Sequence, residues 1–202
     1  MPNNARPLVL ASTSRYRRLL LDRLGVPFEV AAPEVDETAL AGEAPRATAI
    51  RLAEAKARAV AERYAAALVI GSDQVADLDG RAVGKPADHA DAVAQLLAAS
   101  KRTVVFHTGV ALVDTASGRC AVRCVDIAST FRTLTRDDID AYLVREQPYD
   151  CAGSVRSEGF GIALFERIAS DDPTALIGLP LITVVSLLRA EGFDVLAASP
   201  SS

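Results

Sequence analysis

The stretch VIGSDQVADLDG at residues 69–80 is the most informative part of this chain for both fold and chemistry. Its apolar beginning predicts a buried strand over residues 67–71, and Asp79-Gly80 is typical of a tight hairpin turn. Asp73 is therefore expected at the carboxyl end of that strand, where open α/β sheets hold ligands and catalytic groups. It could orient a water molecule, hold a metal ion, or do both. The alternative is that Asp73 is an ordinary turn residue, but the hairpin turn already has its own aspartate in Asp79.

On both sides of this stretch, strand patterns and helix patterns alternate along the chain. Apolar runs predict strands at 8–11, 28–31, 104–113 and 120–132, and helical spacings predict helices at 16–25, 47–67, 88–100, 137–145 and 181–191. Thr135 is the expected N-cap of the fourth helix. A turn at 115–118 joins the two long strands. We therefore expect an α/β fold with a mixed twisted sheet flanked by helices. Since no repeat or linker interrupts the chain, we expect a single domain over residues 1–202.

The composition is that of a folded chain. Of its 202 residues, 50% are hydrophobic and 24% are charged, which excludes a disordered or fibrous protein. The net charge is −4 and the pI is about 5.3, so no overall field favours DNA or RNA and we expect no nucleic-acid partner. A polyanionic substrate would have to bind at a local cluster of Arg and Lys.

The cysteines, the histidines and the N-terminus offer no functional signal. Cys120, Cys124 and Cys151 are odd in number and lack the paired CxxC spacing of zinc sites, so we predict reduced thiols without a metal or disulfide role. His89 and His107 are expected to be neither catalytic residues nor ligands. The first seven residues lack the apolar core of a signal peptide, and no stretch reaches the ~18 apolar residues of a membrane helix. We therefore expect a cytoplasmic protein without a membrane partner.

Positive charge gathers in the segment ASTSRYRRLL at residues 11–20. Hydroxyl residues follow a strand there, and the first turn of the next helix carries Arg15, Arg17 and Arg18. A helix N-terminus has free amides and a partial positive charge, so cations at that end are unfavourable unless an anion compensates them. The segment therefore indicates a phosphate site. The alternative is that a serine simply caps the helix and the arginines are solvated.

Three further segments carry residues suited to a ligand. VGKP places Lys85 in an extended segment just past the hairpin, where it could neutralise charge on a phosphate. PEVDE at residues 33–37 offers carboxylates that suit Mg²⁺ or Mn²⁺, although an ordinary acidic loop is the plainer interpretation. CAGSVRSEGFGIALFE at residues 151–166 combines glycines, which permit close approach of the backbone to a ligand, with Arg156 and Glu158.

Together these segments resemble the Maf family of nucleotide pyrophosphatases. The matching stretches, in family order from Leu10 to about Glu191, are LASTSRYRR, APEVDE, RLAEAKA, VIGSDQVADLDG, VGKP, QPYDCAGSVRSEGFGIALFE and ALIGLPL. The resemblance implies an ITPase-like mixed α/β fold with a deep active-site cleft between two lobes. It also implies hydrolysis between the α- and β-phosphates of a nucleoside triphosphate with a divalent cation, Mg²⁺ or Mn²⁺.

The resemblance also assigns roles to residues in the cleft. Asp73 matches the catalytic acid-base position, and with Glu37 it is expected to hold the metal. Lys85 and Glu37 match catalytic positions, and the expected substrate-binding residues are Ser12, Tyr16, Arg17, Lys56, Gln74 and Glu158.

Tyr16, Gln74 and Glu158 resemble the branch of the family that acts on 7-methyl-GTP. Relatives in that branch carry Trp where Tyr16 stands and Lys where Arg156 stands, so aromatic character and charge are retained. Physical chemistry supports this branch. Methylation makes the purine ring cationic, and a cation placed over an aromatic face gains about 0.5–2 kcal/mol of interaction energy. A carboxylate such as Glu158 can accept hydrogen bonds from the donor edge of guanine.

Two other functions remain open from the sequence. A nucleotide-binding regulator of septum formation or cell division is one, but binding alone does not require Asp73 and Lys85. A nucleic-acid-binding module is the other, and the acidic pI argues against it. The sequence is compatible with a homodimer and does not determine the oligomeric state.

Overall fold

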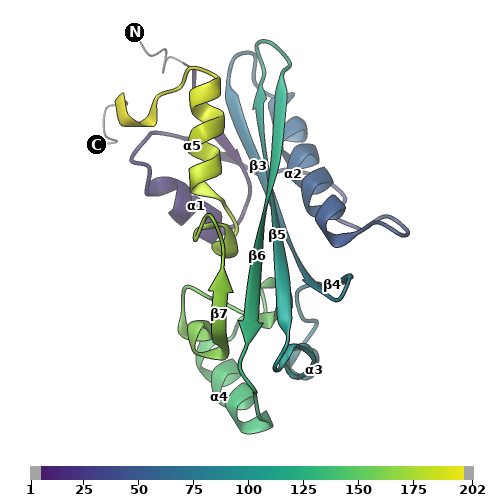
Figure 1. Cartoon of the computed structure of the whole chain (residues 1–202). Helices are drawn as coiled ribbons and strands as arrows, with labels where there is room; N and C mark the ends of the chain where they lie inside the picture. The colour runs from purple at the N-terminus through teal and green to yellow at the C-terminus, as the bar shows by residue number, and fades with distance from the viewer. Residues whose placement is uncertain (1–5, 198–202) are drawn as a thin grey trace.

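The computed structural model describes residues 6–197, and Figure 1 shows its helices and strands. The strands are β1 (Leu8–Ala11), β2 (Glu29–Ala31), β3 (Leu68–Leu78), β4 (Arg81–Val83), β5 (Thr103–Asp114), β6 (Cys120–Phe131) and β7 (Phe165–Ala169). The helices are α1 (Arg15–Asp22), α2 (Pro45–Ala61), α3 (His89–Ala99), α4 (Arg136–Glu146) and α5 (Leu181–Ala190). Residues 1–5, which belong to the polar N-terminal stretch, lie outside the described residues.

The seven strands found within residues 6–197 form one mixed sheet, in the order β2-β1-β3-β5-β6-β7, with β4 paired to β3. β1 runs parallel to both β2 and β3. β3 pairs antiparallel with β4 and β5, and β6 pairs antiparallel with β5 and β7. The predicted mixed α/β fold is therefore confirmed, and the antiparallel pair expected from the turn at residues 115–118 is β5–β6.

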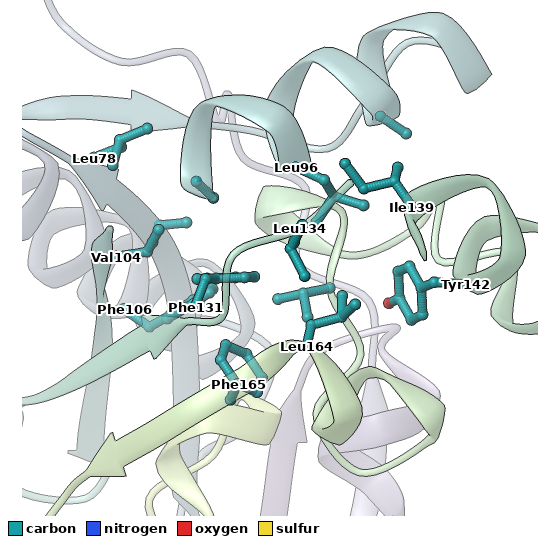
Figure 2. Close-up of a cluster of buried hydrophobic side chains, with 14 of the residues drawn as sticks. Leu78, Leu96, Val104, Phe106, Phe131, Leu134, Ile139, Tyr142, Leu164 and Phe165 are labelled. Atoms are coloured by element: carbon teal, nitrogen blue, oxygen red, sulfur yellow. The ribbon is translucent and has the colours of Figure 1, made fainter. Parts of the chain in front are cut away.

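Helices cover both faces of the sheet, and the long strands β3, β5 and β6 run from one end of the molecule to the other (Figure 1). One apolar core lies between the sheet and helices α1 and α5, and a second lies under α2 on the opposite face. A third core fills the other end, where α3 and α4 pack around Phe106, Phe131 and Tyr142 (Figure 2). The two ends are thus separate lobes joined by shared strands. No helix within residues 6–197 is long and apolar enough to cross a membrane.

Two glycines allow α2 to lie directly on the sheet. A Cβ atom at Gly71 of β3 would be 2.3 Å from the carbonyl oxygen of Ala53, and one at Gly109 of β5 would be 2.3 Å from that of Ala49. Side chains at these positions would push the helix away, because backbone atoms block the space. This close packing brings Lys56 of α2 onto the strand that carries the catalytic candidate Asp73.

Two sequence predictions were wrong in their limits. The predicted strand ends at Gly71, whereas β3 continues to Leu78 and pairs with β5 as far as Asp77, so Asp73 lies mid-strand rather than at the carboxyl end. The polar run does not end the strand because its side chains have partners: Ser72 Oγ, for example, donates to two backbone carbonyls.

The second wrong limit concerns α2, which was expected over residues 47–67. It spans Pro45–Ala61 instead, because the chain turns back after Glu62 to enter β3. β7 was not predicted at all. It is a short edge strand of only five residues, and no turn was predicted at either of its ends.

The N-cap expected at Thr135 is confirmed, and it supplies the first testable prediction. The hydroxyl accepts a hydrogen bond from the backbone N–H of Asp138, whose carboxylate in turn accepts from the Thr135 backbone N–H. We expect Thr135→Ala to lower the free energy of unfolding by about 1 kcal/mol, because the backbone N–H of Asp138 loses its acceptor. Urea denaturation checks this, and Ser at the same position should restore most of the loss.

Candidate active site

The candidate active site lies at a gap along one edge of β3. β1 pairs with β3 only up to Gly71, and β4 pairs with the same edge only from Ala76 onward. Residues 72–75 therefore have β5 on one side and, among the described residues, no strand on the other. A cavity of about 690 Å³ occupies this gap, and Asp73, Gln74 and Val75 line it.

All nine residues that the sequence analysis proposed as site residues line this one cavity. They are Ser12, Tyr16, Arg17, Glu37, Lys56, Asp73, Gln74, Lys85 and Glu158. They come from the loop between β1 and α1, from α1, α2 and β3, and from the segments that follow β2, β4 and α4. Of the three arginines in the first turn of α1, Arg15 and Arg17 reach the cavity, whereas Arg18 is exposed and lies away from it.

A buried lysine joins two carboxylates at the centre of the cavity. Lys56 Nζ lies 2.7 Å from Asp73 Oδ1 and 2.8 Å from Glu37 Oε1. The side chains of Lys56 and Asp73 are only 5% and 10% exposed, whereas that of Glu37 is 58% exposed. The ammonium therefore compensates the buried carboxylate of Asp73, as a buried charge requires. Glu37 connects the pair to the open side of the cavity.

Further positive charge surrounds Glu37. Burial alone would raise the pKa of the Glu37 carboxyl, but the hydrogen bond from Lys56 and the charges of Lys56, Lys85 and Arg17 outweigh it, so the pKa lies below its usual value. Burial lowers the pKa of the Arg17 guanidinium, and the charges of Asp73 and Glu37 oppose that shift. Arg17, Lys56 and Lys85 thus lie close to the carboxylates of Glu37 and Asp73 in one cavity.

Arg17 is held in place by the opposite wall. Its Nε donates to the carbonyl oxygen of Gly178 at 2.9 Å, and that carbonyl also accepts from Ser72 Oγ at 3.0 Å. At the start of the same helix, Ser12 Oγ accepts from the backbone N–H of Ser14, and Ser14 is the N-cap of α1. The positive N-terminus of α1 therefore opens into the cavity together with Arg17.

Tyr16 lies at a second end of the cavity among charged groups. Its hydroxyl lies 2.6 Å from an Arg15 nitrogen and 3.2 Å from an Asp150 oxygen. The guanidinium carbons of Arg15 and Arg156 lie 4.7 Å and 5.4 Å from the centre of its ring. Arg156 is itself held by Glu146 at 2.8 Å and Glu158 at 3.3 Å. An aromatic face that already attracts cations is thus bordered by carboxylates.

Gln74 presents only one of its two polar atoms to the cavity. Its side-chain nitrogen lies 2.9–3.0 Å from Thr108 Oγ1 and from the carbonyl oxygens of Ala175 and Leu176, so both of its N–H groups have acceptors. Since the amide nitrogen is already used, the carbonyl oxygen Oε1 is the atom left for a ligand.

Two sets of polar residues were not predicted from the sequence. Asp150 lines the cavity beside Tyr16, and the segment QPYDC contains it, but nothing in the local pattern singled it out. His107, Cys124 and Asp126 form a cluster on β5 and β6 outside the cavity, although neither His107 nor Cys124 was expected to be a ligand. The spacing Cys124-x-Asp126 is a signal for that cluster, because alternate residues of a strand share a face.

Comparison with known proteins bears on what this arrangement does. A family model described as Maf-like protein matches residues 7–191. This chain belongs to the Maf family. The resemblance seen in the sequence motifs is therefore confirmed over nearly the full length.

Curated Maf-family relatives match the chain from end to end. A protein of Cupriavidus metallidurans is 53% identical and covers 98% of this chain and 100% of its own length. A protein of Burkholderia thailandensis is 57% identical over 96% of this chain and 92% of its own length. A protein of Albidiferax ferrireducens is 54% identical over 96% and 97%. Each of these relatives is named 7-methyl-GTP pyrophosphatase.

Proposed function

We propose that this Maf-family protein hydrolyses nucleoside triphosphates to the monophosphate and pyrophosphate, and that 7-methyl-GTP is its preferred substrate. The observation that carries the proposal is the buried Lys56–Asp73 pair, joined to Glu37 in a cavity that also holds Arg17 and Lys85. A chain with a net charge of −4 gathers cations here, which suits a polyphosphate. The names of the full-length relatives support the same substrate.

The cations bind and orient the triphosphate. Arg17 offers a planar guanidinium beside the free amides at the start of α1, and together they suit phosphate oxygens. Lys85 lines the same cavity as Glu37, where its charge lowers the pKa of that carboxyl, and it can neutralise charge that develops near the scissile bond. Ser12 at the end of β1 adds a hydroxyl on the same side. In phosphoryl transfer, positioning and charge stabilisation of this kind supply most of the catalysis.

Glu37 and Asp73 fit a hard divalent cation such as Mg²⁺ or Mn²⁺. Lys56 engages one oxygen of each carboxylate, and neither Asp73 Oδ2 nor Glu37 Oε2 bonds another described residue. The donor set is therefore two carboxylate oxygens that face a cavity with room for water and phosphate, as these ions require. A bound ion of this kind would neutralise phosphate charge and lower the pKa of a water molecule.

Asp73 is the general base of the proposal. The hydrogen bond from Lys56 Nζ holds Oδ1 and fixes the carboxylate plane. Oδ2 has two lone pairs, so one can face the cation while the other accepts a proton from the attacking water. The site is only partly open to solvent at this depth, because the Asp73 side chain is 10% exposed. Lys56 is then a positioning residue for Asp73 as well as a cation for the substrate.

Tyr16, Glu158 and Gln74 form the base-binding end. The ring of Tyr16 lines the cavity and offers an aromatic face for a cationic 7-methylguanine. The carboxylates of Asp150 and Glu158 offset the charge of the two guanidinium groups beside the ring. Glu158 accepts hydrogen bonds from the N–H groups of guanine, while Gln74 offers Oε1. Neutral bases gain less binding free energy at this end of the cavity, and the smaller pyrimidines leave part of it empty.

Tyr16→Leu tests the base-binding end. We expect kcat/KM for 7-methyl-GTP to fall about 2- to 30-fold more than kcat/KM for GTP, because only the methylated base loses a cation–π contact. Tyr16→Trp should keep the preference. Steady-state kinetics with both nucleotides gives the ratio. An equal decrease for the two nucleotides would show that Tyr16 does not discriminate between them.

The reaction itself is tested by measuring pyrophosphate release across a nucleotide panel, with Mg²⁺, Mn²⁺ and Co²⁺ compared. We expect 7-methyl-GTP to give the highest kcat/KM, and each turnover to release one monophosphate and one pyrophosphate. Release of inorganic phosphate instead would mean attack at the γ-phosphate. No turnover of any triphosphate with any of the metals would reject the enzyme.

A further inference from the structure

A second group of metal-binding side chains lies on the same face of the sheet as α2, apart from the cavity. His107, Cys124 and Asp126 each offer one ligand atom, and these atoms all lie within 4.8 Å of one another. His107 and Asp126 face each other across β5 and β6, and Cys124 is opposite Gly109. None of the three is among the residues that line the cavity. Their backbones belong to two long paired strands, which hold ligands more precisely than loops do.

The imidazole of His107 is oriented as a metal ligand would be. Its Nε2 lies 3.2 Å from Asp77 Oδ2, and its Nδ1 lies 2.8 Å from Asp126 Oδ1. Ligating histidines usually donate their second ring N–H to a carboxylate, which fixes the tautomer and the ring plane. With Asp77 as that carboxylate, Nδ1 is the atom directed at the other two ligands. An ion there would take the place of the Nδ1 proton.

Asp126 is also held by an outer partner. Arg46, in the first turn of α2, places Nε 3.2 Å from Asp126 Oδ2. The other oxygen, Oδ1, lies 2.8 Å from His107 Nδ1 and 3.5 Å from Cys124 Sγ. The side chain of Asp126 is 45% exposed whereas that of His107 is 9% exposed, so an ion can reach the ligands from the Asp126 side.

We propose that His107 Nδ1, Cys124 Sγ and Asp126 Oδ1 bind a Zn²⁺ ion, with a water molecule as the fourth ligand. Imidazole, thiolate and carboxylate are the three ligand types that zinc takes, and the thiolate disfavours Mg²⁺, Mn²⁺ and Ca²⁺. The site is therefore chemically distinct from the two carboxylates at Glu37 and Asp73. It uses none of the cavity residues, so it does not depend on the proposed function.

The ion would link β5 to β6. Asp77 of β3 would hold His107, and Arg46 of α2 would hold Asp126. Since an ion that binds only the folded chain stabilises it, the melting temperature should rise when Zn²⁺ is added to the stripped protein.

The experiment uses the full chain without a histidine tag, stripped with a chelator and dialysed. After addition of Zn²⁺ and gel filtration, we expect one zinc per chain by elemental analysis. Co²⁺ in place of Zn²⁺ should give a thiolate-to-cobalt charge-transfer absorption. Cys124→Ser should abolish that absorption, whereas Cys120→Ser on the same strand and Cys151→Ser should keep it. Asp77→Asn should weaken Zn²⁺ binding about 10- to 100-fold.

Two results with the wild-type protein and the Cys124 variant would overturn the site, and a third concerns a control variant. One is a wild-type protein that retains no zinc and gives no charge-transfer absorption with Co²⁺. The other is an unchanged absorption in Cys124→Ser, since the thiolate would then come from another cysteine. The double variant Glu37→Gln, Asp73→Asn serves as a control, because it should still bind one zinc. Loss of zinc from that variant would place the ion in the cavity and reject the proposal.

Discussion

Replacing Asp73 by Asn is expected to lower kcat for triphosphate hydrolysis about 10³-fold, within the range that a general base contributes. Asn has the same shape as Asp and can still accept a hydrogen bond from Lys56 at its oxygen. It cannot accept a proton from the attacking water, and it is a weaker ligand for a divalent cation. Stopped-time assays of pyrophosphate release from 7-methyl-GTP, in parallel with thermal unfolding, separate lost chemistry from lost structure.

Asp79→Asn is the matched control for this prediction. Asp79 lies in the turn between β3 and β4 with φ at 54°, a conformation that Asn tolerates well, and it is outside the residues that line the cavity. Its variant should keep full activity. If Asp73→Asn retained more than about a tenth of wild-type kcat, proton transfer by Asp73 would be excluded, because general-base catalysis is typically worth at least 10²-fold.

Gly109→Ala is expected to destabilise the fold by about 3 kcal/mol, at the upper end of the cost of overpacking. The added Cβ would lie 2.3 Å from Ala49 O and 2.7 Å from Ala49 C, and neither backbone atom can move without moving α2. For a chain of this size, we expect the melting temperature to fall by about 6–12 °C. Differential scanning calorimetry or circular dichroism measures the change.

The same substitution should reduce activity in the protein that remains folded. Gly109 pairs directly with Asp73 across β3 and β5, so a helix lifted at this point draws Lys56 away from the Asp73 carboxylate. Gly84→Ala is the control for stability, because a Cβ at Gly84 has no neighbour within 4 Å, and it should change the free energy of unfolding by less than about 0.5 kcal/mol. Equal melting temperatures for the two variants would contradict the packing role of Gly109.

Local patterns and the family motifs predicted most of the elements, and all nine of the proposed site residues line the cavity. The apolar and helical periodicities report which face of each segment is buried, and capping residues such as Thr135 report where helices begin. The strand limits were less well predicted, because the polar run Ser72–Asp73–Gln74 continues β3 through partners that are distant in sequence. The proposed ligand His107 was missed for a related reason, since Cys124 and Asp126 lie across from it on the neighbouring strand.

By itself, the sequence determined the alternation of strands and helices, the family, and the segments in which charge gathers. These features depend on residues within a few positions of one another or on motifs preserved in order. Only the tertiary structure decided that Glu37, Lys56 and Asp73 meet at one point, and that β3 has an open edge there. The physical reason is that this meeting depends on α2 packing against two glycines of different strands, and such long-range contacts leave no local pattern.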